Sequence, residues 1–330
     1  MRWRAWITGV WYGHNPLAIL LSPLSWIYRG VVSMRRLAYA KGILPVARFP
    51  VPVIVVGNLT VGGTGKTPLV IALCRLLRSR NYRPGVISRG YGGRSAYWPR
   101  QVHPDSDPYE VGDEPVILAR RIDCPVVVGP HRVAAARFLL QNAACDLVLS
   151  DDGLQHLGLG RDLEICVIDG LRRFGNGRCL PAGPLREPLQ RLQSVDMCLV
   201  NGTAGPGEYA MKIEASAAVS MSHPGNRRSL SSFAGETVHA VAGIGNPERF
   251  FTLLQAHRIR VIGHVYPDHH RYANGEFEFG DAQRVLMTEK DAVKYAHCRD
   301  PKYWYVPIEA VLPSQLEQVL IAKLKGKRSG

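Results

Sequence analysis

Residues 51–67 read Val-Pro-Val-Ile-Val-Val-Gly-Asn-Leu-Thr-Val-Gly-Gly-Thr-Gly-Lys-Thr. The β-branched run at 51–56 predicts a buried strand, and apolar residues at helical spacing over 68–77 predict a helix. A glycine-rich turn between a strand and a helix lets backbone N–H groups and the positive helix end hold phosphate. The stretch therefore predicts a phosphate-loop α/β domain with a mostly parallel sheet.

The loop itself supplies the candidate ATP-binding residues. Lys66 is placed to reach the β- and γ-phosphates, and the Thr67 hydroxyl is placed to ligate Mg²⁺. The strict GxxxxGK[ST] pattern requires glycine at position 60, where this chain has threonine, so we expect a loop of unusual geometry. The predicted ATP-binding set is Thr60, Val61, Gly62, Gly63, Thr64, Gly65, Lys66 and Thr67.

Carboxylates follow a second predicted strand. Residues 146–150 read Asp-Leu-Val-Leu-Ser, and Asp151 and Asp152 follow directly. The carboxyl ends of parallel strands share one sheet edge, so these two aspartates are expected beside the phosphate loop and Mg²⁺. Further strands are predicted at 163–169 and 195–200.

Two other segments carry candidate acid–base groups. Gly112-Asp-Glu-Pro115 places two carboxylates at a predicted helix start, where helix capping would explain one of them. Tyr266-Pro-Asp-His-His270 follows a predicted strand at 260–265, and histidine suits a general base or its partner near neutral pH. For these adjacent histidines a structural or surface role is the alternative.

The 330-residue chain carries a net charge of +14, and no Asp or Glu precedes Asp105. The apolar run 16–28 ends in Trp26 and Tyr28 and is followed by arginines, which is typical of a segment at an anionic membrane surface. Prolines and polar residues interrupt it, so we expect a helix lying on or partly entering the bilayer; a buried core helix is the alternative. The seven scattered cysteines predict reduced thiols of an intracellular protein.

The length favours two domains. We expect a membrane-associated helix at 1–45, a phosphate-loop kinase domain at 46–203, a linker region at 204–235, and a smaller α/β domain at 236–330. Strands are predicted in the last of these near 238–244, 260–265, 284–288 and 303–308. Such an arrangement predicts a cleft that closes between the two domains.

In this order, the segments resemble the tetraacyldisaccharide 4'-kinase family nearly end to end. The matching segments are the phosphate loop with its strand (51–68), SRGYGG (88–93), GDEP (112–115), GPHR (129–132), SDDGLQH (150–156), LPAGPLREP (180–188), AGIGNPERFF (242–251), YPDHH (266–270) and MTEKDAVK (287–294). The resemblance implies transfer of the ATP γ-phosphate to the 4'-hydroxyl of a tetraacylated glucosamine disaccharide 1-phosphate, giving lipid IVA in lipid A biosynthesis. It also implies Mg²⁺ and attachment to the cytoplasmic face of the inner membrane.

The resemblance also implies roles for single residues. It assigns Lys66 to catalysis, Asp113 as the base on the sugar hydroxyl, and His269 as its partner, with His270 left open. It places Mg²⁺ near Thr67, Asp151, Asp152 and Glu187. It assigns the lipid substrate to Asn58, Arg89, Tyr91, Gly92, Arg132, Gln155, His156 and Arg186, among which the three arginines are expected to hold the 1-phosphate.

Two other functions share features of this sequence. A membrane-associated partition- or division-type ATPase shares the glycine-rich loop, but this chain has Val61 where that class carries a signature lysine. Nucleic-acid binding has only the net charge in its favour and lacks a recognition motif, so we expect no nucleic-acid partner.

Overall fold

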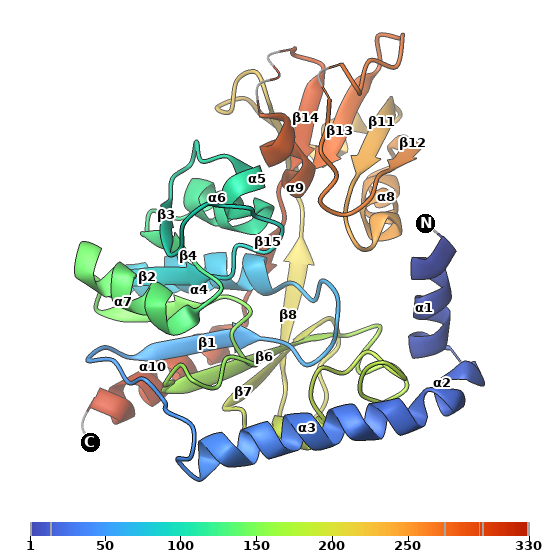
Figure 1. The fold of residues 1–330 in the computed structure, drawn as a ribbon. Coiled ribbons are helices and arrows are strands. Elements are labelled where there is room, and N and C mark those ends of the chain that lie inside the picture. The colour runs from blue at the N-terminus through green and yellow to red at the C-terminus, as the bar shows by residue number, and fades with distance from the viewer. Residues whose placement is uncertain (1, 14, 274, 297, 299, 329–330) are drawn as a thin grey trace.

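The computed structural model describes residues 2–13, 15–273, 275–296, 298 and 300–328. Two mixed, mostly parallel sheets organise the chain, which confirms the predicted α/β class (Figure 1). The larger sheet has the strand order β15 (Glu309–Val311), β8 (Tyr209–Glu214), β7 (Met197–Asn201), β6 (Leu163–Asp169), β1 (Val53–Gly57), β5 (Leu147–Ser150), β2 (Pro84–Ser88), β4 (Val126–Val128) and β3 (Arg100–Val102). Only its two edge strands, β15 and β3, run antiparallel to their neighbours.

The smaller sheet has six strands and carries the C-terminal part of the predicted site. Its order is β10 (Arg227–Ser229), β9 (Ala217–Ser220), β14 (Tyr303–Val306), β13 (Arg284–Thr288), β11 (Thr237–Ala242) and β12 (Arg260–Val265). The strands from β14 to β12 are parallel, and β9 and β10 close one edge in the antiparallel sense.

Helices lie against both sheets, and most of them connect strands. They are α1 (Arg2–Tyr12), α2 (Leu17–Leu20), α3 (Ser22–Ala40), α4 (Lys66–Ser79), α5 (Pro108–Val111), α6 (Asp113–Arg121), α7 (Arg132–Asn142), α8 (Pro247–Ala256), α9 (Glu289–Ala292) and α10 (Ser314–Arg328). Alternate residues of β1 enter two separate cores, because successive side chains of a strand point to opposite faces. Ile54 packs with Leu73 of α4, whereas Val55 packs with Leu139 of α7.

The chain passes between the two sheets within the expected linker. Residues 204–235 contain three strands, of which β8 extends the larger sheet while β9 and β10 belong to the smaller one. The chain returns through β15, which pairs with β8, and α10 then packs on the larger sheet. Figure 1 shows β8 rising from one sheet toward the other. The proposed domain limits remain a prediction, but the C-terminal segment after β14 is part of the larger layer.

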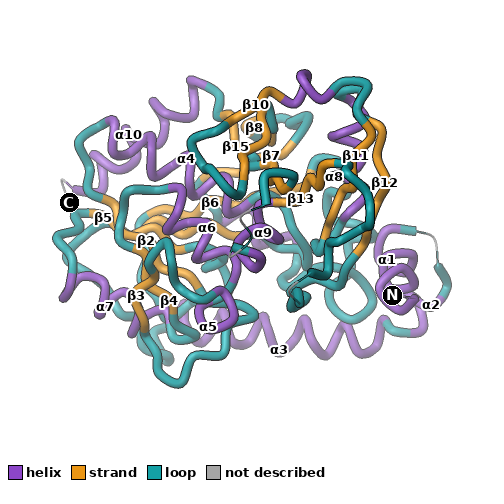
Figure 2. The backbone as a smooth tube through the Cα atoms, turned by 90° about the horizontal axis from the view of Figure 1, so that it is seen from above, coloured by secondary structure: helices purple, strands orange, loops and turns teal. Residues whose placement is uncertain are grey.

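The N-terminal helices lie along one side of the molecule, with α3 running beneath the larger sheet in Figure 1 and along one edge in Figure 2. Within the described ranges, no helix is both long and apolar enough to cross a bilayer. Helix α3 is not a buried core helix either, since Ser22 and Ser25 are its only buried residues. Its inner face is fixed by Ser25, which donates to the Cys179 carbonyl at 2.7 Å, and by Tyr28, which donates to the Arg186 carbonyl at 2.9 Å.

Candidate active site

The phosphate loop connects β1 to α4 in the predicted strand–turn–helix order. Gly65 precedes α4 with φ +100°, a left-handed conformation that favours glycine. Thr60 is buried and forms an isolated antiparallel bridge with Leu185. On either side, Arg186 donates its amide to the Leu59 carbonyl at 2.7 Å, and Val61 donates to the Pro184 carbonyl at 2.9 Å. The loop's first half is therefore extended and held by the 184–186 segment, which explains why glycine is not needed at position 60.

The second half of the loop is not held by the 184–186 segment in the way that residues 59–61 are. Gly62 and Gly63 are exposed, while the Thr64 hydroxyl is buried and has no hydrogen-bond partner among the described residues. The Lys66 ammonium lies 3.2 Å from Asn58 Oδ1 and 3.5 Å from Asp152 Oδ1. Lys66 therefore stands at the loop mouth between a neutral oxygen and a carboxylate.

Asp151 and Asp152 follow β5, the strand beside β1, as the sheet argument predicted. Asp151 Oδ2 accepts from the Thr67 hydroxyl at 3.5 Å, and its Oδ1 is buried with no hydrogen-bond partner in the described part of the chain. Burial raises the pKa of Asp151 to about 6, against the opposing effect of Lys66.

Asp152 has the opposite electrostatic environment. Burial alone would raise its pKa, but Lys66 and Arg186 outweigh that effect and hold the pKa well below its ordinary value. One Arg186 Nη lies 3.2 Å from each Asp152 carboxylate oxygen. Asp152 also has φ +51°, an uncommon backbone conformation for a residue other than glycine.

Residues of the two sheets meet at Asp113. This carboxylate is 3% exposed at the start of α6, and its Oδ2 lies 2.9 Å from Nδ1 of His269 in the loop after β12. The His269 ring lies 5.2 Å from the ring of Tyr91, and His269 has φ +62°. His270 is directed elsewhere, to Glu276 Oε1 at 2.8 Å. The structure therefore pairs His269, and not His270, with Asp113.

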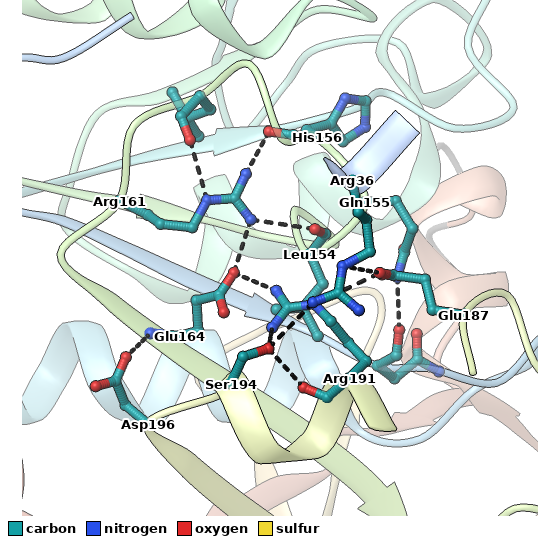
Figure 3. Close-up of polar contacts among 12 residues, drawn as sticks. Arg36, Leu154, Gln155, His156, Arg161, Glu164, Glu187, Arg191, Ser194 and Asp196 are labelled. Atoms are coloured by element: carbon teal, nitrogen blue, oxygen red, sulfur yellow. Dashed lines mark hydrogen bonds and ion pairs between the residues drawn. The ribbon is translucent and has the colours of Figure 1, made fainter. Parts of the chain in front are cut away.

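Glu187, predicted near the metal, takes part in a chain of polar contacts drawn in Figure 3. Its Oε1 accepts from the Gln155 amide at 2.9 Å. Its Oε2 lies 3.4 Å from Arg191 Nε and 3.7 Å from Arg36 Nε of α3. The carboxylate is therefore neutralised by two arginines, which the sequence motifs did not indicate.

The network in Figure 3 continues to the segment after Asp152. Arg191 also contacts Glu164, which pairs with Arg161 at 2.8 Å. Arg161 in turn donates to the carbonyls of Leu154, at 3.1 Å, and His156. Ion pairs among Glu187, Arg191, Glu164 and Arg161 thus lead to hydrogen bonds that hold the 151–156 loop.

The three arginines expected on the substrate phosphate have different surroundings. Arg132 is 2% exposed and donates to the carbonyls of Gly129, at 2.8 Å, and Asp151, at 3.2 Å. Arg186 is engaged by Asp152, and Arg89 is exposed with its guanidinium 6.0 Å from the Tyr91 ring centre. Of the three, Arg89 is the exposed residue, whereas the Arg186 side chain is 27% exposed and Arg132 is buried.

Three further predicted substrate residues lie beside the phosphate loop or the 151–156 loop. Asn58 is fully buried and donates to the Thr60 carbonyl at 2.7 Å, and Gln155 donates to the Asn58 carbonyl at 3.1 Å. Burial and the nearby arginines Arg132 and Arg89 lower the pKa of His156 to about 4. The imidazole is therefore neutral at pH 7, and its surroundings are electropositive.

Comparisons with known proteins agree on one family. The family described as tetraacyldisaccharide-1-P 4'-kinase matches residues 17–325. Tetraacyldisaccharide 4'-kinase from Nitrosococcus oceani is 51% identical over 96% of this chain and 93% of its own length. The enzyme of the same name from Alkalilimnicola ehrlichii is 54% identical over 88% of this chain and 87% of its own length. The crystal structure of LpxK from Aquifex aeolicus in complex with ATP has a TM-score of 0.80 and 28% identity, covering 93% of this chain and 99% of that one.

Proposed function

This chain belongs to the tetraacyldisaccharide 4'-kinase family of lipid A biosynthesis, and from that premise we propose how its residues divide the reaction among them. The enzyme is an ATP-dependent lipid-sugar kinase. In our proposal the γ-phosphate passes from ATP at the phosphate loop to the 4'-hydroxyl of a tetraacylated disaccharide 1-phosphate, giving lipid IVA. Asp113 accepts the hydroxyl proton.

The contact between Asp113 and His269 is the observation that carries this proposal. With Oδ2 receiving the hydrogen bond from His269 Nδ1, Asp113 Oδ1 is left to take the proton. His269 orients the carboxylate. Asp113 starts a helix that lies between strands of the larger sheet in the sequence, and His269 follows a strand of the smaller one, so the pair forms only when the two parts are docked.

ATP binding is supported by the Aquifex structure, which is a complex with ATP. In our proposal the backbone of residues 60–65 surrounds the phosphates and Lys66 stabilises the charge that develops during transfer. Asn58 and Asp152 hold the Lys66 ammonium at the loop mouth. This arrangement positions Lys66 before the nucleotide arrives.

A Mg²⁺ ion fits the residues beside the loop. Asp151 has a buried oxygen without a hydrogen-bond partner among the described residues, and the Thr67 hydroxyl lies next to its other oxygen. Hard oxygen ligands of this kind suit Mg²⁺, which usually takes one or two carboxylates and completes its shell with phosphate oxygens and water. When bound, the ion would neutralise phosphate charge; Asp151 and Thr67 would hold it, with Asp152 nearby.

We assign the 1-phosphate of the acceptor to the region of Arg89 and His156. Arg89 is exposed, and burial together with the positive charge of Arg132 and Arg89 lowers the pKa of His156. A phosphate bound here would offset that positive charge. Arg132 and Arg186 contribute to this field, although their hydrogen bonds go to protein atoms.

The outer face of α3 supports peripheral attachment to the cytoplasmic face of the inner membrane. Its exposed apolar residues recur at helical spacing at Leu24, Ile27, Val31 and Met34, and Trp26 is 70% exposed beside them. An amphipathic helix of this kind, which also carries Arg29, Arg35 and Arg36, lies in the interface of an anionic bilayer.

Transfer of ³²P from γ-labelled ATP to the disaccharide 1-phosphate lipid tests the assignment. We expect wild-type protein with Mg²⁺ to label the lipid, and Asp113→Ala to lose most of this activity. Near-normal transfer by Asp113→Ala would exclude Asp113 as the base. Release of label as inorganic phosphate without the acceptor would instead favour the ATPase alternative.

A further inference from the structure

Lys290 of α9 lies between the two chain segments that carry the proposed base pair. Its ammonium lies 2.6 Å from Glu114 Oε1 and 3.0 Å from Asp268 Oδ1. Glu114 directly follows Asp113, and Asp268 directly precedes His269. One cation therefore joins the residue next to the base and the residue next to its partner, across the boundary between the two sheets.

The Lys290 contacts are shielded from solvent and strongly charged. The Lys290 side chain is 17% exposed. Burial would lower the pKa of Lys290, but Glu114, Asp268 and Asp113 outweigh it and raise the pKa above its ordinary value. Likewise, burial would raise the pKa of Glu114, but Lys290 outweighs it and keeps the pKa below its ordinary value. The Glu114 carboxylate and the Lys290 ammonium thus remain ionised together near pH 7.

Another contact already docks the same two helices. Arg121, at the far end of α6, donates to both oxygens of Glu289 at 2.9 and 3.1 Å and also reaches Glu309. Its side chain is 12% exposed, similar to that of Lys290. Docking of α6 on α9 therefore does not depend on Lys290 alone. The two ion pairs differ mainly in where they meet α6: Lys290 binds Glu114, next to Asp113, whereas Arg121 lies at the other end of the helix.

The position of His269 depends on contacts of this kind because its backbone is in the left-handed region. Such a conformation is unfavourable for a non-glycine residue and persists where the surroundings hold it. Asp268 supplies the adjacent anchor. Within α9, Asp291 accepts hydrogen bonds from the Gly243 amide and the Tyr272 hydroxyl, which fix the helix in place.

We propose that Lys290 is a positioning residue for phosphoryl transfer, holding Asp113 and His269 in register through Glu114 and Asp268. This inference rests on the proposed base role of Asp113. Without the ammonium, the two carboxylates repel each other and the His269 loop moves away from α6. Misplacement by about 1 Å is sufficient to lower the rate of the chemical step by about 10²-fold.

The test compares Lys290→Met with Arg121→Met as a matched control in the full-length protein. We expect Lys290→Met to lower kcat for lipid phosphorylation by about 10²-fold, with KM for ATP within threefold of wild type. Arg121→Met should keep kcat within threefold, although both variants lose an ion pair between α6 and α9. Lys290→Arg should recover at least tenfold of the lost kcat, because a guanidinium can still bridge the two carboxylates.

A double-mutant cycle separates positioning from general stability. In the His269→Ala background, Lys290→Met should cost no more than about twofold further, since the geometry it maintains is already lost. If Lys290→Met fails to fold, Lys290→Met combined with Glu114→Gln removes the unpaired buried charge at Glu114 and should show the same fall in kcat.

Three results would overturn the inference. They are a folded Lys290→Met variant with kcat within threefold of wild type, an equal loss in Arg121→Met, and an undiminished cost of Lys290→Met in the His269→Ala background. Asp113→Ala measured alongside distinguishes the two proposals. Activity retained by Asp113→Ala contradicts the base assignment, whereas loss in Asp113→Ala with full activity in Lys290→Met contradicts only the role of Lys290.

Discussion

The buried carboxylate of Asp151 should destabilise the protein when neither nucleotide nor Mg²⁺ is present. Its pKa rises on folding from an ordinary value of 3.8 to about 6 because burial disfavours the charged form. Below pH 3.8 the group is protonated in both states and contributes nothing. As the pH rises from about 4 to 6, the unfolded chain ionises first and the free energy of unfolding falls; above pH 6 the loss is constant.

The pKa difference sets the size of the effect. At about 1.36 kcal/mol per pH unit, the full loss is about 3 kcal/mol at pH 8 and about 1.6 kcal/mol at pH 5. Asp151→Asn cannot ionise, so we expect it to be more stable than wild type by about these amounts. Stabilisation by MgATP should be greater for wild type than for Asp151→Asn, since bound cation offsets the buried charge.

Urea unfolding of both proteins at pH 8 and pH 5, followed by circular dichroism, measures the difference directly. Asp152→Asn is the matched control from the adjacent position, where the pKa is shifted downward; it should lose stability at pH 8. The reasoning is refuted if Asp151→Asn is no more stable than wild type at pH 8, or if its advantage does not shrink at pH 5.

Three further predictions concern single residues. A Cβ on Gly92 would lie 2.9 Å from His269 Nδ1 at φ +83°, so Gly92→Ala should lower kcat by about 10²-fold while KM for ATP changes little; an unchanged kcat would contradict this. Arg132→Met should lower the free energy of unfolding by about 2–4 kcal/mol in urea titrations, because two carbonyls lose their donor; unchanged stability with weakened lipid affinity would instead favour direct substrate contact. Ile27→Glu should reduce sedimentation with phosphatidylglycerol vesicles, whereas the equally polar change Val311→Glu should not, and equal binding by both variants would contradict the role of α3.

The sequence predicted the parts of the fold that depend on local pattern. The strand before the phosphate loop, the helix after it and the strand ending at Asp151 all lie where periodicity placed them. Crossings between the sheets were not predictable in the same way. Residues 222–235 are rich in Ser, Gly and Arg and were predicted, together with 204–221, to form a linker region, yet 204–235 includes short strands, of which β8 and β9 pair with strands far away in the sequence. The pairing of β8 with β15 is a long-range contact that no local sequence pattern predicts.

The site shows the same division between local and long-range information. Motifs indicated Lys66, Asp113 and the histidine pair, but only the folded chain distinguishes His269 from His270. Arg191 was not identified, because a buried arginine that neutralises Glu187 has no sequence signature. Lys290 belonged to a recognised segment, MTEKDAVK, whose role was not evident until α9 was seen to face α6.

The division of labour between the phosphate loop and the Asp113–His269 pair is tested most directly by a single-turnover experiment. Enzyme preloaded with labelled ATP and Mg²⁺ is mixed with excess disaccharide lipid, and ATP affinity is measured separately by calorimetry. We predict that Asp113→Ala binds ATP as tightly as wild type but transfers its γ-phosphate at least about 10²-fold more slowly. Weakened ATP binding with an unchanged transfer rate would contradict the account.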